Sequence, residues 1–191
     1  MNADPYLRPA FSLRNRAARA AWNVVWALFF RPSPRIFFAW RRWLLRAFGA
    51  HIAPRCNIYP KARIWAPWNL ICDEAATIAD EVVVYNPAPI VLGSHAIVSQ
   101  QAYLCGASHD VDDPDFPLFA APITLGAYAW VAARATVLPG VALGDYAVLA
   151  LGSVATRDLA AGGIYVGVPA RHVRQRRVTV ELQRRAGQGA T

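Results

Sequence analysis

The residues best able to do chemistry gather around His109, within the segment YLCGASHD at residues 103–110. An imidazole has an ordinary pKa of about 6.5, so it can accept and release a proton near neutral pH. The loop DVDDPDFPLFAAP, residues 110–122, leaves directly after it. A long loop in an otherwise regular chain is typical of a functional site. Cys105 is a nearby nucleophile, but it ends an aliphatic stretch and we expect it to be buried.

An aliphatic side chain recurs at every sixth position on both sides of this loop. A period of six suits neither a helix with 3.6 residues per turn nor a β-meander, and it is typical of a solenoid of short strands. Before the loop the period begins at Ile52 and slips by two residues at Ile78 and again at Leu92. Coils of roughly eighteen residues would give about five or six turns. After the loop the period is regular and includes Leu125, Val131, Val137, Leu143 and Leu149.

Two helices are predicted ahead of the solenoid, over residues 13–30 and 34–48, with RPSP between them. Ser33 is suited to cap the second helix, Pro34 to its first turn and Gly49 to the position after its end. Both helices are rich in Trp, Phe and Arg. They can either cap the first coil or rest on an anionic membrane surface, and the sequence leaves both roles open for residues 13–48.

The composition indicates one folded domain with appendages at its two ends. The chain has 191 residues, 55 % of them hydrophobic, which is enough for a substantial core. We expect a helical hairpin at residues 1–50, the solenoid at 51–170 with its loop at 110–122, and a basic tail at 171–191. Residues 178–191 are predicted as a short polar helix or a frayed end.

The charge of the chain is distributed unevenly. The net charge is +8 at pH 7, but residues 51–170 hold five basic against ten acidic residues, so the excess of arginine belongs to the two ends. A nucleic-acid-binding domain usually has a basic face on its folded body, and we expect no nucleic-acid partner. Three widely spaced cysteines indicate a reducing cytoplasm. With neither a signal peptide nor a membrane-spanning segment, we expect a cytoplasmic protein or one peripheral to the inner membrane face.

Several segments carry a resemblance to a known family. The six-residue repeat, the loop after Ser-His-Asp and the closing GVPAR at 167–171 resemble the hexapeptide-repeat acyltransferases. FRPSPR at 30–35, RIWAPWNL at 63–70, YLCGASHD and DPDF at 113–116 are similar to the branch of colanic acid biosynthesis acetyltransferases, which is concerned with exopolysaccharide. The resemblance implies an all-β fold, a left-handed parallel β-helix with an N-terminal helical hairpin, assembled as a homotrimer.

The resemblance also implies a reaction and the residues that perform it. Family members transfer acetyl from acetyl-CoA to a sugar, and the histidine at the mouth of the loop, here His109, is the general base. In related sugar acetyltransferases a backbone N–H beside a Trp-containing turn stabilises the oxyanion. The matching residues are Trp130 and Ala133. The family's coenzyme lies in a groove between two subunits, and the matching cofactor-binding positions are Trp130, Leu151, Thr156, Arg157, Arg171 and Arg174.

The acceptor site is less well indicated. Tyr85 and Asn86 lie in a stretch similar to the exopolysaccharide branch, and Asp113 lies in the loop, so these three are candidates to contact a sugar or a lipid-linked oligosaccharide. Asp113 is followed by proline and is equally suited to a turn.

Three functions fit these patterns. The preferred one is a metal-independent O-acetyltransferase in which the acceptor attacks acetyl-CoA directly, without an acyl-enzyme. The alternatives are an N-acetyltransferase acting on an amino sugar nucleotide and a non-catalytic scaffold of a glycan-synthesis complex. We expect no metal site, because His95 and His109 are too far apart in sequence for the paired zinc ligands that an anhydrase on the same fold would need.

Overall fold

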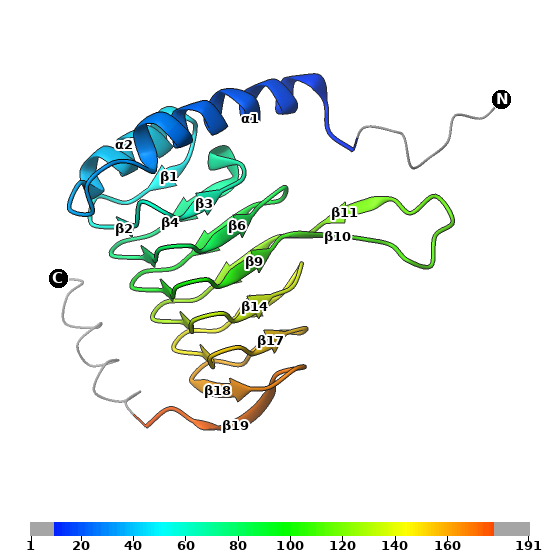
Figure 1. Ribbon diagram of the computed structural model, residues 1–191. Coiled ribbons are helices and arrows are strands. Elements are labelled where there is room, and N and C mark those ends of the chain that lie inside the picture. The colour runs from blue at the N-terminus through cyan, green and yellow to red at the C-terminus, as the bar shows by residue number, and fades with distance from the viewer. Residues whose placement is uncertain (1–9, 178–191) are drawn as a thin grey trace.

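The inward aliphatic residue at every sixth position builds three short strands into each turn of a solenoid. A computed structural model describes residues 10–177, and over this range the chain coils about six times into a three-sided prism (Figure 1). Sheet A contains β1 (His51–Ile52), β4 (Leu70–Cys72), β7 (Ile90–Leu92), β12 (Ile123–Leu125) and β15 (Ala142–Leu143). Sheet B contains β2 (Asn57–Ile58), β5 (Thr77–Ile78), β8 (Ile97–Val98), β13 (Trp130–Val131), β16 (Val148–Leu149), β18 (Gly163–Val166) and β19 (Arg171–Gln175). Sheet C contains β3 (Arg63–Ile64), β6 (Val83–Tyr85), β9 (Tyr103–Cys105), β14 (Thr136–Val137) and β17 (Val154–Ala155).

The aliphatic period forms the core, as predicted. Val131 pairs in parallel register with Val98 of the preceding coil and Leu149 of the following coil, and all three side chains are fully buried. Sheets A and C repeat the same arrangement. Each such side chain contributes about 1.5–3 kcal/mol through burial, so the stack of coils is the main source of stability.

The coils differ in length, and this explains the slips in the period. Late coils contain eighteen residues, since Val131 lies in register with Leu149, whereas early coils contain twenty, since Ile58 lies in register with Ile78. The expected coil of roughly eighteen residues is therefore correct after the hairpin, and the first coils are two residues longer. The two extra residues widen the corner that joins sheet C to sheet A. One such corner contains the short helix η3 (Pro67–Asn69).

The N-terminal helices cap the first coil, whose strands would otherwise expose unpaired carbonyl groups. They are α1 (Leu13–Val25), the π-helical turn η2 (Trp26–Phe30) and α2 (Phe38–Ala47), and they lie across the first end of the prism (Figure 1). Their side chains donate to carbonyl oxygens on or beside all three edge strands. The bonds run from Trp22 to Ile64 (2.7 Å), Trp26 to Ala62 (2.9 Å), Arg41 to Ile58 (2.6 Å), Arg42 to Cys56 (2.8 Å) and Arg46 to Ile52 (2.8 Å).

Arg41 is the central residue of this cap. Its side chain is fully buried and donates to the carbonyl oxygens of Ile58, Pro34 and Arg35 and to the Ser33 hydroxyl. Burial lowers its pKa, but an arginine remains charged at neutral pH. The same contacts overturn the predicted start of the second helix. The carbonyl oxygens of Pro34 and Arg35 accept from the Arg41 guanidinium group, and α2 begins only at Phe38. The Ser33 hydroxyl donates to the Phe30 carbonyl rather than capping the helix.

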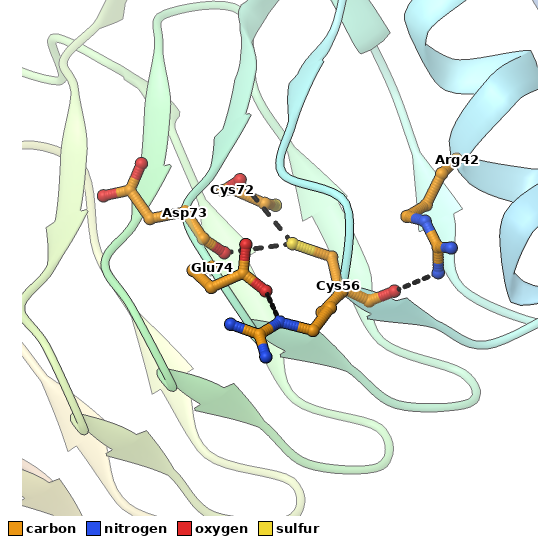
Figure 2. Close-up of polar contacts among 6 residues, drawn as sticks. Arg42, Cys56, Cys72, Asp73 and Glu74 are labelled. Carbon is orange, nitrogen blue, oxygen red and sulfur yellow. Dashed lines mark hydrogen bonds and ion pairs between the residues drawn. The ribbon is translucent and has the colours of Figure 1, made fainter. Parts of the chain in front are cut away.

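The cysteines near this cap have structural roles. Cys56 and Cys72 are buried free thiols, and burial raises the pKa of both. Figure 2 shows the Cys56 sulfur directed at the backbone of the next coil, where it donates to the Asp73 carbonyl oxygen at 3.0 Å. A buried thiol held in this way is a poor nucleophile.

The C-terminal segment is partly different from the prediction. Residues 171–175 form β19, antiparallel to β18, so the expected tail begins as an edge strand of sheet B. The helix or frayed end predicted for 178–191 lies outside the described residues.

Substitution of Arg41 should destabilise the protein more than substitution of an exposed arginine does. Arg41→Ala leaves three buried or half-buried carbonyl groups without this donor, and each lost partner costs about 1–3 kcal/mol. We expect a loss of about 3 kcal/mol or more in the free energy of unfolding, measured by urea denaturation at fixed protein concentration. Arg14→Ala, an exposed control on α1, should change it by less than about 0.5 kcal/mol. Equal effects of the two variants would contradict this role.

Candidate active site

The loop after His109 is a β-hairpin that leaves the widened corner between sheets C and A. Strand β10 (Ala107–His109) continues from β9 and pairs antiparallel with β11 (Leu118–Ala120), and the hairpin extends sideways from the prism (Figure 1). The expectation of a loop over 110–122 is therefore correct at the tip and wrong at residues 118–120, which are a strand. Gly106 lies where the chain leaves β9 for the hairpin, and glycine is required there because a Cβ would lie only 2.7 Å from the Tyr85 carbonyl oxygen.

The hairpin fixes the orientation and tautomer of His109. Its Nδ1 lies 2.8 Å from the Phe116 carbonyl oxygen, and its ring stacks on the Phe116 ring with centroids 4.5 Å apart. A carbonyl oxygen can only accept, so Nδ1 carries the proton and Nε2 keeps its lone pair in the neutral ring. The side chain is exposed. This arrangement suits a general base that receives a proton at Nε2.

The tip of the hairpin holds the Phe116 carbonyl in place. Asp113 accepts a hydrogen bond from the Asp115 amide through its carboxylate at 2.8 Å, and its own carbonyl accepts from the Phe116 amide at 2.8 Å. Phe116 adopts a left-handed conformation, with φ of 45°. Asp113 therefore shapes the turn that supports His109, and it is exposed on the same hairpin. Sequence reasoning gave no role to Phe116, although it lies within the DPDF motif.

A groove of about 400 Å³ on the outer face of sheet B brings together three of the predicted residues, Trp130, Ala133 and Leu151. The Trp130 indole N–H donates to the Ser99 hydroxyl at 2.8 Å, which fixes the ring beside the groove. Gln100 also lines the groove, and the rest of the lining is small or aliphatic, with Ala132, Ala150, Val148 and Ile164. The Ala133 amide has no acceptor within residues 10–177, so it remains available to a bound group. A narrow apolar channel of this kind suits an extended chain such as pantetheine.

The other residues predicted to bind the coenzyme, Thr156, Arg157, Arg171 and Arg174, lie on two different faces of the prism. Arg174 lies in register with Ile164, which lines the groove, and Arg171 lies further along the same strand; both are exposed on β19. Thr156 and Arg157 follow β17 and are exposed on the side of sheet C. A single chain therefore brings Arg171 and Arg174 to the sheet that holds the groove, and leaves Thr156 and Arg157 on another.

The acceptor candidates have different environments. Tyr85 is half-buried in sheet C, in register with Cys105 at the root of the hairpin, and its ring packs on Trp65 at 5.4 Å. Burial raises the pKa of Tyr85, so its phenol stays protonated and can donate a hydrogen bond.

Asn86 is fully buried, and its role is structural. Its amide accepts from the Ala66 N–H at 2.9 Å and donates to the Ala66 carbonyl at 2.7 Å, which joins the widened corners of two coils. The prediction that Asn86 contacts the acceptor is not supported, because this side chain has no surface to offer.

Comparison with known proteins defines the class first. No protein-family model matches the chain. The fold resembles a hexapeptide-repeat acetyltransferase of Vibrio cholerae complexed with acetyl-CoA, with a TM-score of 0.78 and 23% identity over 87% of this chain and 91% of the other. It also resembles a galactoside acetyltransferase in complex with CoA, with a TM-score of 0.77 and 19% identity over 90% and 86% of the two chains. The solenoid is thus the left-handed parallel β-helix of hexapeptide-repeat acetyltransferases, as predicted.

Sequence identity then defines the family. The chain is 37% identical over 155 residues to the "Putative colanic acid biosynthesis acetyltransferase WcaF" of Escherichia coli (strain K12), covering 81% of this chain and 85% of that protein. The chain belongs to the family of colanic acid biosynthesis acetyltransferases.

Two further observations apply to residues 10–177. No group of three or more His, Cys, Asp or Glu side chains in this range is placed to hold a metal ion. Its helices are all too short or too polar to cross a membrane.

Substitution of Asn86 separates a structural from a binding role. Asn86→Ala leaves the amide and carbonyl of Ala66 without partners, at a cost of about 2–4 kcal/mol in the free energy of unfolding. The KM for the acceptor should stay within about twofold of wild type for the folded fraction. A large rise in KM with unchanged stability would restore Asn86 as a contact of the acceptor.

Proposed function

We propose that this protein is an O-acetyltransferase that moves acetyl from acetyl-CoA to a sugar hydroxyl in exopolysaccharide biosynthesis. The observation that carries the proposal is the tautomer of His109, whose Nδ1–H is held by the Phe116 carbonyl so that Nε2 is left as an acceptor. Membership of an acetyltransferase family supports the reaction type.

The reaction proceeds in one complex of donor and acceptor. The sugar hydroxyl oxygen attacks the thioester carbonyl carbon of acetyl-CoA while His109 Nε2 takes the hydroxyl proton. The Ala133 amide donates to the oxyanion of the tetrahedral intermediate. The carbon–sulfur bond then breaks, and the imidazolium returns its proton to the departing CoA thiolate. Direct attack is supported by the contact of Cys105, which is half-buried rather than buried as expected and whose thiol donates to the Ala107 carbonyl at 3.2 Å.

The site is shared between two chains of a homotrimer. His109 lies on a hairpin at the far end of sheet C, whereas the groove lies on sheet B, and Ala133 is separated from His109 by the full width of sheet C. A base on one face and a donor groove on another meet when the hairpin of one copy reaches the groove of its neighbour. Thr156 and Arg157 on sheet C would then complete the coenzyme site begun by Trp130, Leu151, Arg171 and Arg174 on sheet B.

The acceptor is a sugar or a lipid-linked oligosaccharide, which would hold the reaction at the inner face of a membrane. Tyr85 supports this role because it lies on the outer face of sheet C, in register with the strand that leads into the His109 hairpin. Asp113 has one carboxylate oxygen in the Asx turn and an exposed position on the same hairpin, which suits a hydrogen bond to a sugar hydroxyl.

Replacement of His109 by asparagine tests the base. The amide of the introduced asparagine can still donate to the Phe116 carbonyl in place of Nδ1, so the hairpin keeps its support, but the group that accepts the proton is gone. Acceptor-dependent release of CoA thiol should fall roughly a hundredfold or more in His109→Asn, while the Kd for CoA stays unchanged. Sugars, amino sugars and lipid-linked oligosaccharides form the acceptor panel, and a preference for amines would favour N-acetylation. A protein that does not bind CoA would favour the scaffold.

Mixing two inactive variants tests the shared site. Ala150→Trp fills the groove but leaves His109 intact, and His109→Asn has the complementary defect. Co-expressed at equal amounts with different tags, the two should recover about one quarter of the wild-type activity, since random trimers pair an intact hairpin with an intact groove at that fraction of interfaces. If each chain held a complete site, the mixture would stay inactive.

A further inference from the structure

The outer surface of the helical cap exposes aromatic and aliphatic side chains that make no hydrogen bond to the first coil; the Trp40 indole N–H donates to the Phe29 carbonyl within the cap at 2.9 Å. Leu28, Phe29, Pro32, Pro34, Phe37 and Trp40, together with Ser33, line a groove of about 400 Å³ between the end of η2 and the start of α2. Trp43 stacks on Trp40 with ring centroids 5.2 Å apart, and Ile36 lies beside Phe37 in the sequence. We call Leu28, Phe29, Ile36, Phe37, Trp40 and Trp43 the cap patch.

Capping does not account for the cap patch. The groups that satisfy the first coil are the indoles of Trp22 and Trp26 and the guanidinium groups of α2, and they face the prism. The cap patch faces away from it: Trp43 is 58% exposed, Phe29 52% and Ile36 80%. The π-helical turn contributes to this separation, since it buries Phe30 completely and leaves Leu28 and Phe29 outside.

Arginine predominates around the cap patch, and the acidic side chain whose charge acts on Arg35 is Asp80 of the second coil. Arg31 and Arg35 border the cap patch and are exposed, each over an aromatic ring, Trp26 and Tyr59 respectively. Residues 1–50 contain nine arginines and one acidic residue, Asp4. Apolar and aromatic side chains flanked by arginine are complementary to a bilayer with anionic headgroups, where indole rings settle at the boundary between headgroups and acyl chains.

We propose that the cap patch docks the protein onto the surface of an anionic lipid bilayer, with the prism axis standing away from the membrane. The side chains of the cap patch enter the acyl boundary, and Arg31 and Arg35 bind lipid phosphates. Two copies meeting cap to cap are disfavoured, because the same arginines would face each other with no acidic residue of 10–50 to pair with them. In the proposed trimer the three caps lie at one end and bind together, and this part rests on the proposed function.

Vesicle flotation of the full chain tests the docking. Wild type should float with vesicles of phosphatidylcholine and phosphatidylglycerol at a 7:3 ratio, with apparent affinity at least tenfold above that for phosphatidylcholine alone, and binding should weaken with salt. Phe29→Ser/Trp43→Ser should lose at least tenfold of the affinity for the anionic vesicles. Arg31→Gln/Arg35→Gln should lose it for anionic vesicles and leave binding to neutral ones unchanged. Val173→Ser, which removes an exposed valine from β19, should bind like wild type.

Two further measurements distinguish a loss of membrane docking from misfolding and from a loss of catalysis. Thermal unfolding of the double variant Phe29→Ser/Trp43→Ser should match wild type, since both side chains are exposed. Its acetyl transfer to a water-soluble acceptor should also be unchanged. Failure of the docking proposal can therefore be told apart from failure of the proposed catalytic function. Quenching of wild-type tryptophan fluorescence by brominated lipid should fall in Trp43→Phe. The proposal is overturned if wild type does not float with anionic vesicles, if the cap-patch variant floats equally well, or if that variant instead abolishes self-association of the trimer.

Discussion

Hydrogen bonding between successive coils is the constraint on which this structure depends. Each short strand has too few contacts to persist alone, so every coil needs a neighbour on both sides. The first coil pairs with the second but has no coil on its outer side, so the carbonyl groups that its edge strands present there must be satisfied by other means. Tryptophan and arginine side chains from α1, η2 and α2 supply the donors, and this requirement explains why a buried arginine lies under a helix of the cap.

The candidate active site lies where the regular coil is interrupted. The corner between sheets C and A carries two extra residues in the early coils and a whole hairpin in the third, so the same place in the coil accepts increasing departures from the repeat. Inward residues keep their register through every interruption, because the core would otherwise be exposed. The prism can therefore present His109 on a long arm without changing its own packing.

The sequence predicted much of this arrangement and missed contacts that depend on three dimensions. The period of six predicted the inward column from Leu125 to Leu149, and the break in the period marked His109. The late start of α2 was not predictable from local signals, because Ser33 and Pro34 are good helix starters whose oxygens are instead recruited by Arg41 eight and seven residues away. Asn86 was misassigned for a similar reason: its partner Ala66 is twenty residues earlier, and only the coil length brings the two together.

We propose that acetyl passes directly from acetyl-CoA to the acceptor, with His109 as the base and with no covalent role for Cys105. The initial rate of CoA release, measured while both substrates are varied, tests it most directly. Direct transfer in a ternary complex predicts double-reciprocal lines that intersect. Parallel lines, together with radioactive acetyl retained on the protein before acceptor is added, would show an acyl-enzyme and exclude direct transfer.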